Sequence, residues 1–459
     1  MKNTAAFLLI MLSVVLEVQA QTHEDRYRPT DWPDHVILNL TEEGNERTIT
    51  WRTDTSAGPQ SVQWLVADAS SNLEEKAKTA AAHSEMIQTE EVLAQYSTYH
   101  FKGLTAGITY AYRVGAKEHW SEWYQFNIPH EDQAFTFLYF GDAQNDMRDL
   151  WSRCIRKATD LSEEVDFMLH AGDMVDFASA NREWGEWFFG GGWMFASTPQ
   201  VPVAGNHEYV RKNGQPALNH YWRASFTVPL NGPAGLEETV YYFDYENVRF
   251  IVLDSRDMLI DDEHAKRQAH WLETLLKNND QKWTIISHHH PIYSARANRG
   301  DYKVRAWLEP LYDKYGVDLV LQGHHHSFAR GRGEKEVGKE MFSGPVYYVS
   351  NSGPKMYDTN FAPWMERVGT DVQLFHQVKV VDNTIEVLTY LVNGELYDHI
   401  KLTKRANGDK EFHEIAIEGI KERLDFSHAS YGADIDLGEE NRKRFKKMAE
   451  EYLRKRQKR

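Results

Sequence analysis

Hydrophobic and polar positions in residues 33–130 alternate in short runs that are typical of β-strands. Turn-forming residues such as Gly44 and Gly107 separate these runs, which lie at 36–40, 48–51, 61–66, 99–101 and 110–114. Short strands at this spacing are typical of a small β-sandwich. We therefore expect residues 33–130 to form an all-β domain.

The pattern changes at Phe135, where longer apolar runs end in polar motifs and are followed by helical periodicity. These runs lie at 135–140, 165–170, 201–204, 250–253, 284–287 and 317–321. One more strand pair, 385–390 and 399–402, surrounds the turn Asn393-Gly394. Polar residues at the carboxyl ends of strands are where open α/β sheets build their sites. We expect an α/β (α+β sandwich) domain over residues 134–403.

The two ends of the chain carry different signals. Lys2, the apolar run that follows it and Val18-Gln19-Ala20 form the pattern of a signal peptide over residues 1–20. No later stretch has the ~20 apolar residues of a membrane-spanning helix. We expect an exported protein, which is periplasmic, secreted or on the cell surface, without a transmembrane segment.

Residues 404–459 are polar, and the last 19 hold ten Lys or Arg against two Glu. A solvated helix or a frayed terminus explains this charge. The alternative is attachment to an anionic surface or to an acidic face of the chain itself. We interpret this segment as a polar, basic C-terminal tail.

Composition narrows the possible functions. The chain of 459 residues is 41% hydrophobic, which excludes a wholly disordered protein. Its net charge of −16 argues against nucleic acid as a general partner. The single Cys154 excludes an intrachain disulfide framework and a cysteine zinc cluster, whereas 21 His favour a search for a metal site. The sequence carries no prediction of the oligomeric state.

Seven metal-ligating or proton-transferring side chains follow the expected strands: Asp142, Asp173, Asn206, His207, His289, His324 and His326. Oxygen ligands mixed with imidazoles suit Zn, Mn or Fe. Asp173 is the natural carboxylate bridge between two ions, which at about 3.5–4 Å clamp a phosphoryl group and lower the pKa of a water. His207, next to Asn206, is placed to protonate the leaving oxygen.

Each of these signals has a structural alternative. A Gly-Asp pair after a strand is also a common helix cap, and a single His is more often only hydrogen-bonded. The run Gly323 to His326 is sharper, because in an extended segment His324 and His326 point to one side and His325 to the other. We therefore expect His324 and His326 to be ligands.

The ordered series Gly-Asp, Gly-Asp, Gly-Asn-His-Glu, apolar-x-x-His and Gly-His-x-His resembles the calcineurin-like metallophosphoesterase superfamily, and within it the purple acid phosphatases. The segment 104–115 is similar to the end of their fibronectin type III-like N-terminal domain, and 323–330 to their Gly-His-x-His segment. The resemblance covers residues 33 to about 403. It implies a phosphatase that acts on a phosphorylated small molecule or protein.

The resemblance also implies two divalent or trivalent metal ions (Fe, Zn or Mn). One ion would be held by Asp142, Asp173 and His326. The second would be held by Asp173, Asn206, His289 and His324. His207 and Asp173 would be the catalytic residues, with His207 as an acid that touches the phosphate.

Three places leave alternatives open. His288, His289 and His290 run together; the family spacing favours His289 as the ligand, with His288 as the alternative and His290 on the substrate side. Asp176 stands where purple members have a tyrosine, so the purple chromophore should be absent. Gln144 also departs from the family pattern, and either it or Asp176 supplies a ligand or a hydrogen bond to one. Arg296 is a candidate phosphate contact or a solvated loop charge.

The sequence therefore predicts an exported, dinuclear metal-dependent phosphatase that hydrolyses phosphate monoesters by attack of a metal-bound hydroxide. A phosphodiesterase or nucleotidase on the same metal centre is the alternative. A third hypothesis, from another class, is a non-catalytic binding module with a vestigial metal site.

Overall fold

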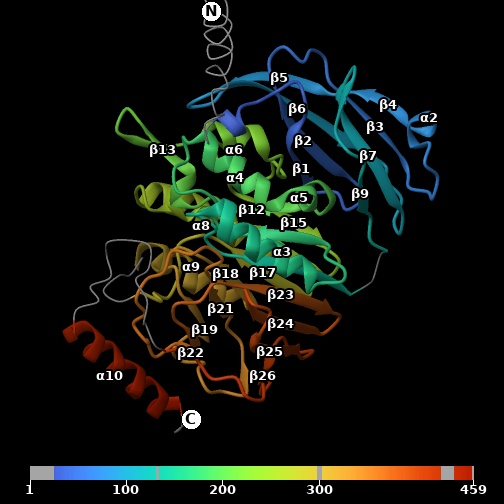
Figure 1. The fold of residues 1–459 in the computed structure, drawn as a ribbon. Coiled ribbons are helices and arrows are strands. Elements are labelled where there is room, and N and C mark those ends of the chain that lie inside the picture. The colour runs from blue at the N-terminus through green and yellow to red at the C-terminus, as the bar shows by residue number, and fades with distance from the viewer. Residues whose placement is uncertain (1–24, 131–133, 297–301, 425–438, 457–459) are drawn as a thin grey trace, which may run out of the picture.

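The computed structural model describes the chain except for residues 1–24, 131–133, 297–301, 425–438 and 457–459. Two β-sheets lie face to face at the centre of the molecule, and helices cover their outer faces (Figure 1). A small β-sandwich adjoins one of these sheets (Figure 1). The expected α+β sandwich with an all-β unit in front of it is confirmed.

The first central sheet has twelve strands. Its strands β10, β11, β12 and β1 are parallel neighbours, and β23 joins β10 antiparallel. In spatial order the strands are β20 (Met341–Phe342), β26 (Lys410–Glu414), β25 (Leu396–Lys404), β24 (Thr384–Leu391), β23 (Leu374–Val381), β10 (Phe135–Phe140), β11 (Phe167–His170), β12 (Gln200–Pro202), β1 (Asp34–Leu40), β2 (Arg47–Thr53), β6 (Leu93–Phe101) and β5 (His83–Gln88).

The second central sheet has seven strands, of which β16, β17, β18 and β21 are parallel. Parallel strands buried on both faces read as nearly continuous apolar runs, which is the pattern of these segments. In spatial order the strands are β15 (Tyr241–Tyr245), β16 (Val248–Val252), β17 (Trp283–Ser287), β18 (Leu319–Gln322), β21 (Val346–Val349), β19 (Phe328–Arg332) and β22 (Met365–Gly369).

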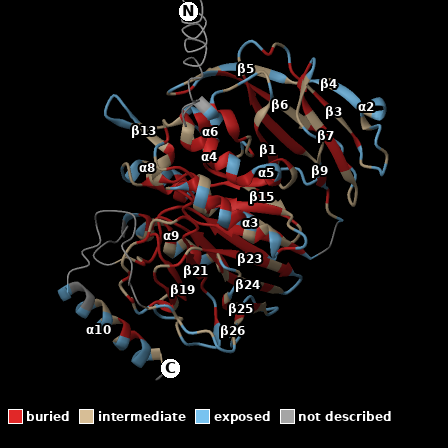
Figure 2. Ribbon diagram, viewed as in Figure 1, coloured by how far each residue is buried: buried red, intermediate tan, exposed pale blue. Residues whose placement is uncertain are grey.

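Aromatic side chains fill the space between the two central sheets. The rings of Phe137 and Phe167 stack with centroids 4.9 Å apart, and Phe250 from the opposite sheet meets both edge-on at 5.4 and 5.2 Å. These residues belong to one core built from both sheets, which is the buried centre in Figure 2. Because this core is wide and fully buried, it holds the strand ends that carry the site in fixed positions.

Helices cover the outer face of each central sheet. The first sheet is covered by η2 (Met147–Trp151), α3 (Ser152–Asp160), α4 (Asn181–Gly191), α5 (Trp193–Ser197) and α6 (His220–Ser225). The second is covered by α7 (Ser255–Met258), α8 (Asp262–Lys277), α9 (Tyr302–Tyr315) and α10 (Glu439–Arg456). Across the described ranges, every helix is too short or too polar to cross a membrane.

The β-rich region before residue 130 contributes strands to two sheets. Its own five-stranded sheet consists of β4 (Lys78–Ala81), β3 (Ser61–Val66), β7 (Thr109–Ala116), β8 (His119–Trp120) and β9 (Tyr124–Asn127). Two short helices, η1 (Asp25–Tyr27) and α2 (Leu73–Lys76), complete the described part of the region. Strand β1 pairs in parallel with β12 at Asn39 and Gln200, so one sheet runs from the sandwich into the larger unit. This continuity fixes the sandwich beside the strand ends that carry the site.

The described part of residues 404–459 contains two elements that contact the rest of the chain. Strand β26 extends the first sheet (Figure 1). Helix α10 packs apolar side chains against the rest of the chain. Of these side chains, Phe445 and Tyr452 contact the ring of Phe361 at 5.1 and 5.6 Å. Arg456 pairs with Glu414 at 3.0 Å and Glu422 at 2.8 Å. The polar, basic C-terminal tail over residues 404–459 stays a prediction, within which the described β26 and α10 contact the rest of the chain. The expected signal peptide, 1–20, lies outside the described residues.

Candidate metal centre

The carboxyl ends of neighbouring strands carry the candidate ligands. Asp142 follows β10, Asp173 follows β11 and Asn206 follows β12 in the first sheet. His289 follows β17, and the His324–His326 segment follows β18 in the second sheet. Because the two sheets face each other, these ends meet at one edge of the core. This arrangement forms two groups of side chains, Asp173-His289-His324 and Asp142-Asp173-His326. Within each group the potential ligand atoms all lie within 4.8 Å of one another.

Asp173 is the residue that both groups share. Its Oδ2 lies 3.0 Å from His289 Nε2 and accepts a hydrogen bond from Gln144 Nε2 at 3.2 Å. Its Oδ1 accepts the backbone N–H of His207 at 2.8 Å. The residue adopts a left-handed backbone with φ of 51°, which is costly for a non-glycine residue and is typical of functional sites. One carboxylate thus faces both groups, as a bridge between two ions requires.

Asp142 completes the second group. Its Oδ2 accepts the backbone N–H of His324 at 2.7 Å, and its Oδ1 lies 3.6 Å from His326 Nε2. Glycines make this close packing possible. A Cβ added at Gly323 would lie 2.4 Å from Asp142 Oδ2, and one at Gly205 would lie 2.3 Å from Asp173 Oδ1. The glycines of the Gly-His and Gly-Asn motifs therefore leave room for the carboxylates.

The structure distinguishes the three consecutive histidines. His289 Nδ1 donates to the Ala171 carbonyl at 2.8 Å, which turns Nε2 toward Asp173 and leaves it as the ring nitrogen that could bind a metal ion. His288 turns away, with Nδ1 2.8 Å from the His290 carbonyl. His290 Nδ1 lies 2.9 Å from Ser255 Oγ, and its ring centroid is 4.2 Å from that of His324. Only His289 of the three joins a metal-ligating group.

The His324–His326 segment is not extended, so the reason for expecting alternate side chains to share one side was wrong. His324 and His326 both adopt left-handed backbone, with φ of 71° and 41°. Their rings nevertheless join the two groups, while His325 Nδ1 accepts the backbone N–H of Ala295 at 3.1 Å. A tight irregular loop, and not strand alternation, turns these two rings toward the carboxylates.

The neighbouring candidates occupy distinct places. His207 Nδ1 donates to the Asp176 carbonyl at 2.6 Å, which leaves Nε2 4.0 Å from Asp173 Oδ2 in a side chain that is 27% exposed. The Asp176 carboxylate lies 3.6 Å from His207 and belongs to neither metal-ligating group. Gln144 Nε2 bridges Asp173 and His326 Nε2, the latter at 3.1 Å. Arg296 stacks on Tyr357 with its guanidinium carbon 3.8 Å from the ring centroid.

Two residues beside the centre were missed from the sequence. Buried Glu208 accepts backbone N–H groups of Asp173 and Gly205 at 2.9 and 2.7 Å, so its carboxylate ties two ligand loops together. Lys355 Nζ lies 3.7 Å from Asp176 Oδ1 in a side chain that is 14% exposed. Glu208 was visible as the last letter of the Gly-Asn-His-Glu motif. Lys355 has no local signal, because its place depends on the fold.

Burial and mutual charge perturb the pKa values of this cluster. Burial raises the pKa of Asp142 to about 7 and that of Glu208 to about 7. Burial opposes ionisation of Asp173 and His289 as well, but their opposite charges outweigh it. The pKa of Asp173 is therefore lowered, and that of His289 is raised to about 10. Two buried carboxylates close to each other need positive charge nearby, which metal ions supply.

The donor atoms fit metal ions. Several buried polar atoms at the centre have no hydrogen-bond partner among the described residues, namely Asp142 Oδ1, Gln144 Oε1, Asn206 Oδ1 and His326 Nδ1. A buried carboxylate or amide oxygen without a partner is costly unless a cation or water satisfies it. Carboxylate and amide oxygens mixed with imidazole nitrogens match the preferences of Zn, Mn and Fe.

The comparisons with known families agree with this geometry. The family described as calcineurin-like phosphoesterase matches residues 135–328, and the one described as purple acid phosphatase, N-terminal domain, matches residues 33–128. Fold and site thus define a metallophosphoesterase of the calcineurin-like class. Within that class the chain is similar to the purple acid phosphatases, as the match of their N-terminal domain and the names of its relatives indicate.

Individual relatives point the same way. Acid phosphatase type 7 of Danio rerio is 26% identical over 363 residues, which cover 66% of this chain and 76% of that protein. Probable purple acid phosphatase 20 of Arabidopsis thaliana is 27% identical, covering 72% and 76%. The structure of purple acid phosphatase PPD1 from yellow lupin superposes with a TM-score of 0.70 at 17% identity, covering 82% of this chain and 75% of that one. This last likeness shows the shared fold.

Proposed function

We propose that the protein hydrolyses phosphate monoesters with two metal ions held at the candidate metal centre. The single observation that carries this proposal is the position of Asp173, whose carboxylate belongs to both ligand groups. A carboxylate shared by two groups of nitrogen and oxygen donors is the arrangement that a dinuclear site needs. The chemistry of the donors leaves Fe, Zn and Mn as the candidate ions.

The ligands divide into two sets. Asp142, Asp173 and His326 would hold one ion. Asp173, Asn206, His289 and His324 would hold the other. When bound, the ions supply positive charge that draws the phosphoryl oxygens in and lowers the pKa of a water.

The protein's own residues would orient the site and move a proton. The Ala171 carbonyl fixes the His289 ring, and Glu208 holds the loops of Asp173 and Gly205. His207 would donate a proton from Nε2 to the leaving oxygen, because its Nδ1 is already bound to the Asp176 carbonyl. Its partial exposure leaves this nitrogen within reach of a substrate.

We further propose the limits of the functional units and the destination of the chain. The N-terminal unit would span residues 33–130 and the catalytic unit 134–403, with β26 and α10 packed onto the latter. The apolar segment after Lys2 supports removal of residues 1–20 and export of the mature chain. N-terminal sequencing of the purified exported protein tests the cleavage site.

The mutational test of the proposal replaces the shared carboxylate and one imidazole. We expect Asp173→Ala and His324→Ala each to lower kcat/KM for nitrophenyl phosphate about a thousandfold or more, because each removes a ligand from the centre. Circular dichroism should show that the fold survives. The exposed residues Asp160 and His83 provide matched controls, Asp160→Ala and His83→Ala, which should keep the wild-type rate.

Full activity in Asp173→Ala or His324→Ala would overturn the proposal. Bis-nitrophenyl phosphate, assayed in parallel, separates monoesterase from diesterase activity. Turnover of the diester alone would indicate that the same metal centre belongs to a phosphodiesterase.

A further inference from the structure

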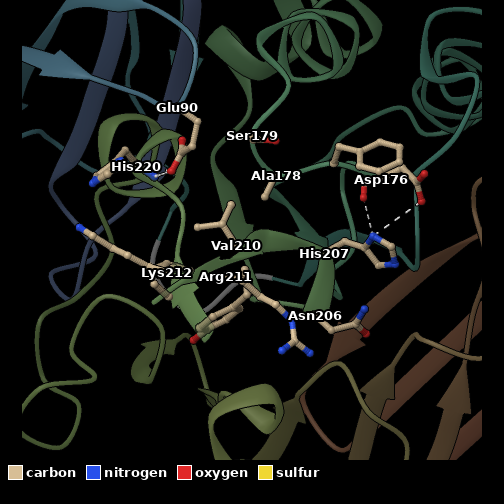
Figure 3. A pocket seen from close by; sticks show the side chains of 14 residues that line it. Glu90, Asp176, Ala178, Ser179, Asn206, His207, Val210, Arg211, Lys212 and His220 are labelled. Atoms are coloured by element: carbon tan, nitrogen blue, oxygen red, sulfur yellow. Dashed lines mark hydrogen bonds and ion pairs between the residues drawn. The ribbon is translucent and has the colours of Figure 1, made fainter. Parts of the chain in front are cut away.

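A cavity of about 680 Å³ opens directly beside the candidate metal centre. It lies between the β13–β14 hairpin, β13 (Tyr209–Lys212) and β14 (Gln215–Leu218), and the loop 176–179 (Figure 3). Asn206 and His207 of η3 (Asn206–Glu208) form part of its wall. The cavity shares these two residues with the centre. When the phosphate group of an ester lies at the centre, its leaving group can therefore extend into this cavity.

The cavity wall is partly apolar. Tyr209, Val210, Ala217 and Leu218 line one side, and Phe177 lines the loop side. Phe177 is 62% exposed, which is unusual for a large aromatic residue next to a set of buried ligands. An exposed ring beside a cavity offers a flat apolar surface to an organic group.

Two adjacent cations lie on the hairpin. Arg211 and Lys212 are exposed, and neither has an ion pair with any acidic side chain in the part of the chain that the structure describes. In Figure 3 the guanidinium of Arg211 extends toward Asn206, whereas Lys212 extends the other way. This divergence follows from the alternation of side chains along a strand.

The acidic residues of the cavity already have partners. Glu90 lies 3.1 Å from His220 Nδ1, and the Asp176 carboxylate lies between His207 and Lys355 at 3.6 and 3.7 Å. Of the two cations on the hairpin, Arg211 is the one that extends toward Asn206, so it is the charge available on that side of the cavity. Guanidinium groups bind carboxylates and phosphates through two parallel hydrogen bonds. An arginine that contacts only water makes no such pair of bonds and is free to form it with a ligand.

We propose that this cavity receives the leaving group of the substrate and that Arg211 selects leaving groups carrying a second negative charge. The substrate class is then an organic phosphate monoester with an apolar or aromatic body and a second anionic group. The inference rests on the proposed phosphatase function and adds the specificity of the same site.

The test uses two esters of nearly equal shape, 4-carboxyphenyl phosphate and 4-carbamoylphenyl phosphate, which differ by one negative charge. For each enzyme the ratio of the two kcat/KM values is measured, and ratios are compared between variants so that the intrinsic reactivity of the esters cancels. We expect Arg211→Gln to lower the ratio about tenfold, since a charge-assisted hydrogen bond is worth about 1.5–3 kcal/mol and 1.4 kcal/mol is a tenfold effect.

Lys212→Gln is the matched control, because it removes the same charge from the next position on the strand. We expect it to change the ratio less than threefold. An unchanged ratio in Arg211→Gln, or equal losses in both variants, would overturn the assignment to Arg211. Absence of turnover of both esters by the wild type would instead contradict the phosphatase function itself.

Discussion

Single residues at the centre adopt conformations that the sequence pattern alone would not favour. Asp173, His324 and His326 all have positive φ, which costs on the order of 1–3 kcal/mol for a non-glycine residue. Such strain persists only where surrounding contacts hold it. Here Glu208 accepts the Asp173 backbone N–H and Asp142 accepts that of His324, so buried carboxylates fix the strained turns.

A prediction at this scale concerns the proton donor. His207→Gln should slow hydrolysis of esters with poor leaving groups about a hundredfold, because general acid catalysis contributes most where the leaving oxygen needs a proton. Nitrophenyl phosphate, whose leaving group departs without help, should lose far less. Kinetics across a series of substituted phenyl phosphates measures the difference. A uniform loss across the series would contradict the proton-donor role.

A second residue-scale prediction concerns colour. Asp176 stands where the resemblance to purple members implies a tyrosine, and its carboxylate lies beside His207 and Lys355. We expect the metal-loaded protein to lack the visible tyrosinate-to-iron absorption even when reconstituted with iron. Absorption spectroscopy with elemental analysis of the same sample checks this. A purple iron-containing protein would contradict the assignment and point to another tyrosine ligand.

At the scale of elements, the strand ends that carry the candidate ligands could be predicted, because each combines a buried apolar run with an adjacent polar motif. Other elements were missed. The segment of β26 reads as polar, yet its Lys410 is fully buried beside Asp318 at 3.1 Å, a contact between residues far apart in the sequence. The β13–β14 hairpin was missed as well, since its exposed polar residues give no alternating pattern.

The glycines that precede the ligands give a prediction about these loops. A Cβ at position 205 would lie 2.3 Å from Asp173 Oδ1, so Gly205→Ala should displace the carboxylate. We expect metal affinity to fall about 10- to 100-fold, as it does when a group supporting a ligand is disturbed. Gly44→Ala, where no atom lies within 4 Å, is the control and should leave metal affinity unchanged. Metal titration measures both, and wild-type affinity in Gly205→Ala would contradict this role.

At the scale of the whole molecule, the fold class of sheets covered by helices could be predicted from the sequence. The contacts that join the separate parts of the fold could not. The continuous pairing of β1 with β12 depends on contacts between distant segments, and the same is true of Lys355 beside Asp176. The motifs with candidate ligands could be found in the sequence because each one consists of a few consecutive residues. The cavity beside them required the hairpin, the loop 176–179 and the N-terminal unit to be assembled.

The buried His376 in the first central sheet should make the stability of the fold depend on pH. Burial lowers the pKa of His376 to about 3, while its ring nitrogens lie near Ser350 and Thr389 at 2.8 and 2.9 Å. The folded state keeps this ring neutral, whereas the unfolded state takes up a proton below pH 6.5. The free energy of unfolding should therefore fall as pH drops below 6.5, by up to about 1.4 kcal/mol per pH unit from this residue.

His376→Gln removes that titration. Urea unfolding between pH 7 and pH 4 should show a shallower decline for this variant than for the wild type. Equal slopes in the two proteins would contradict the neutral buried state of His376.

The central claim, a dinuclear centre that hydrolyses phosphate monoesters, is tested most directly by measuring metal content and activity on one purified sample. Elemental analysis for Fe, Zn and Mn should find about two ions per chain. The same sample should turn over nitrophenyl phosphate, and removal of metal by a chelator should abolish this activity until metal is restored. A chain that binds no metal tightly and shows no turnover after metal addition would contradict the account.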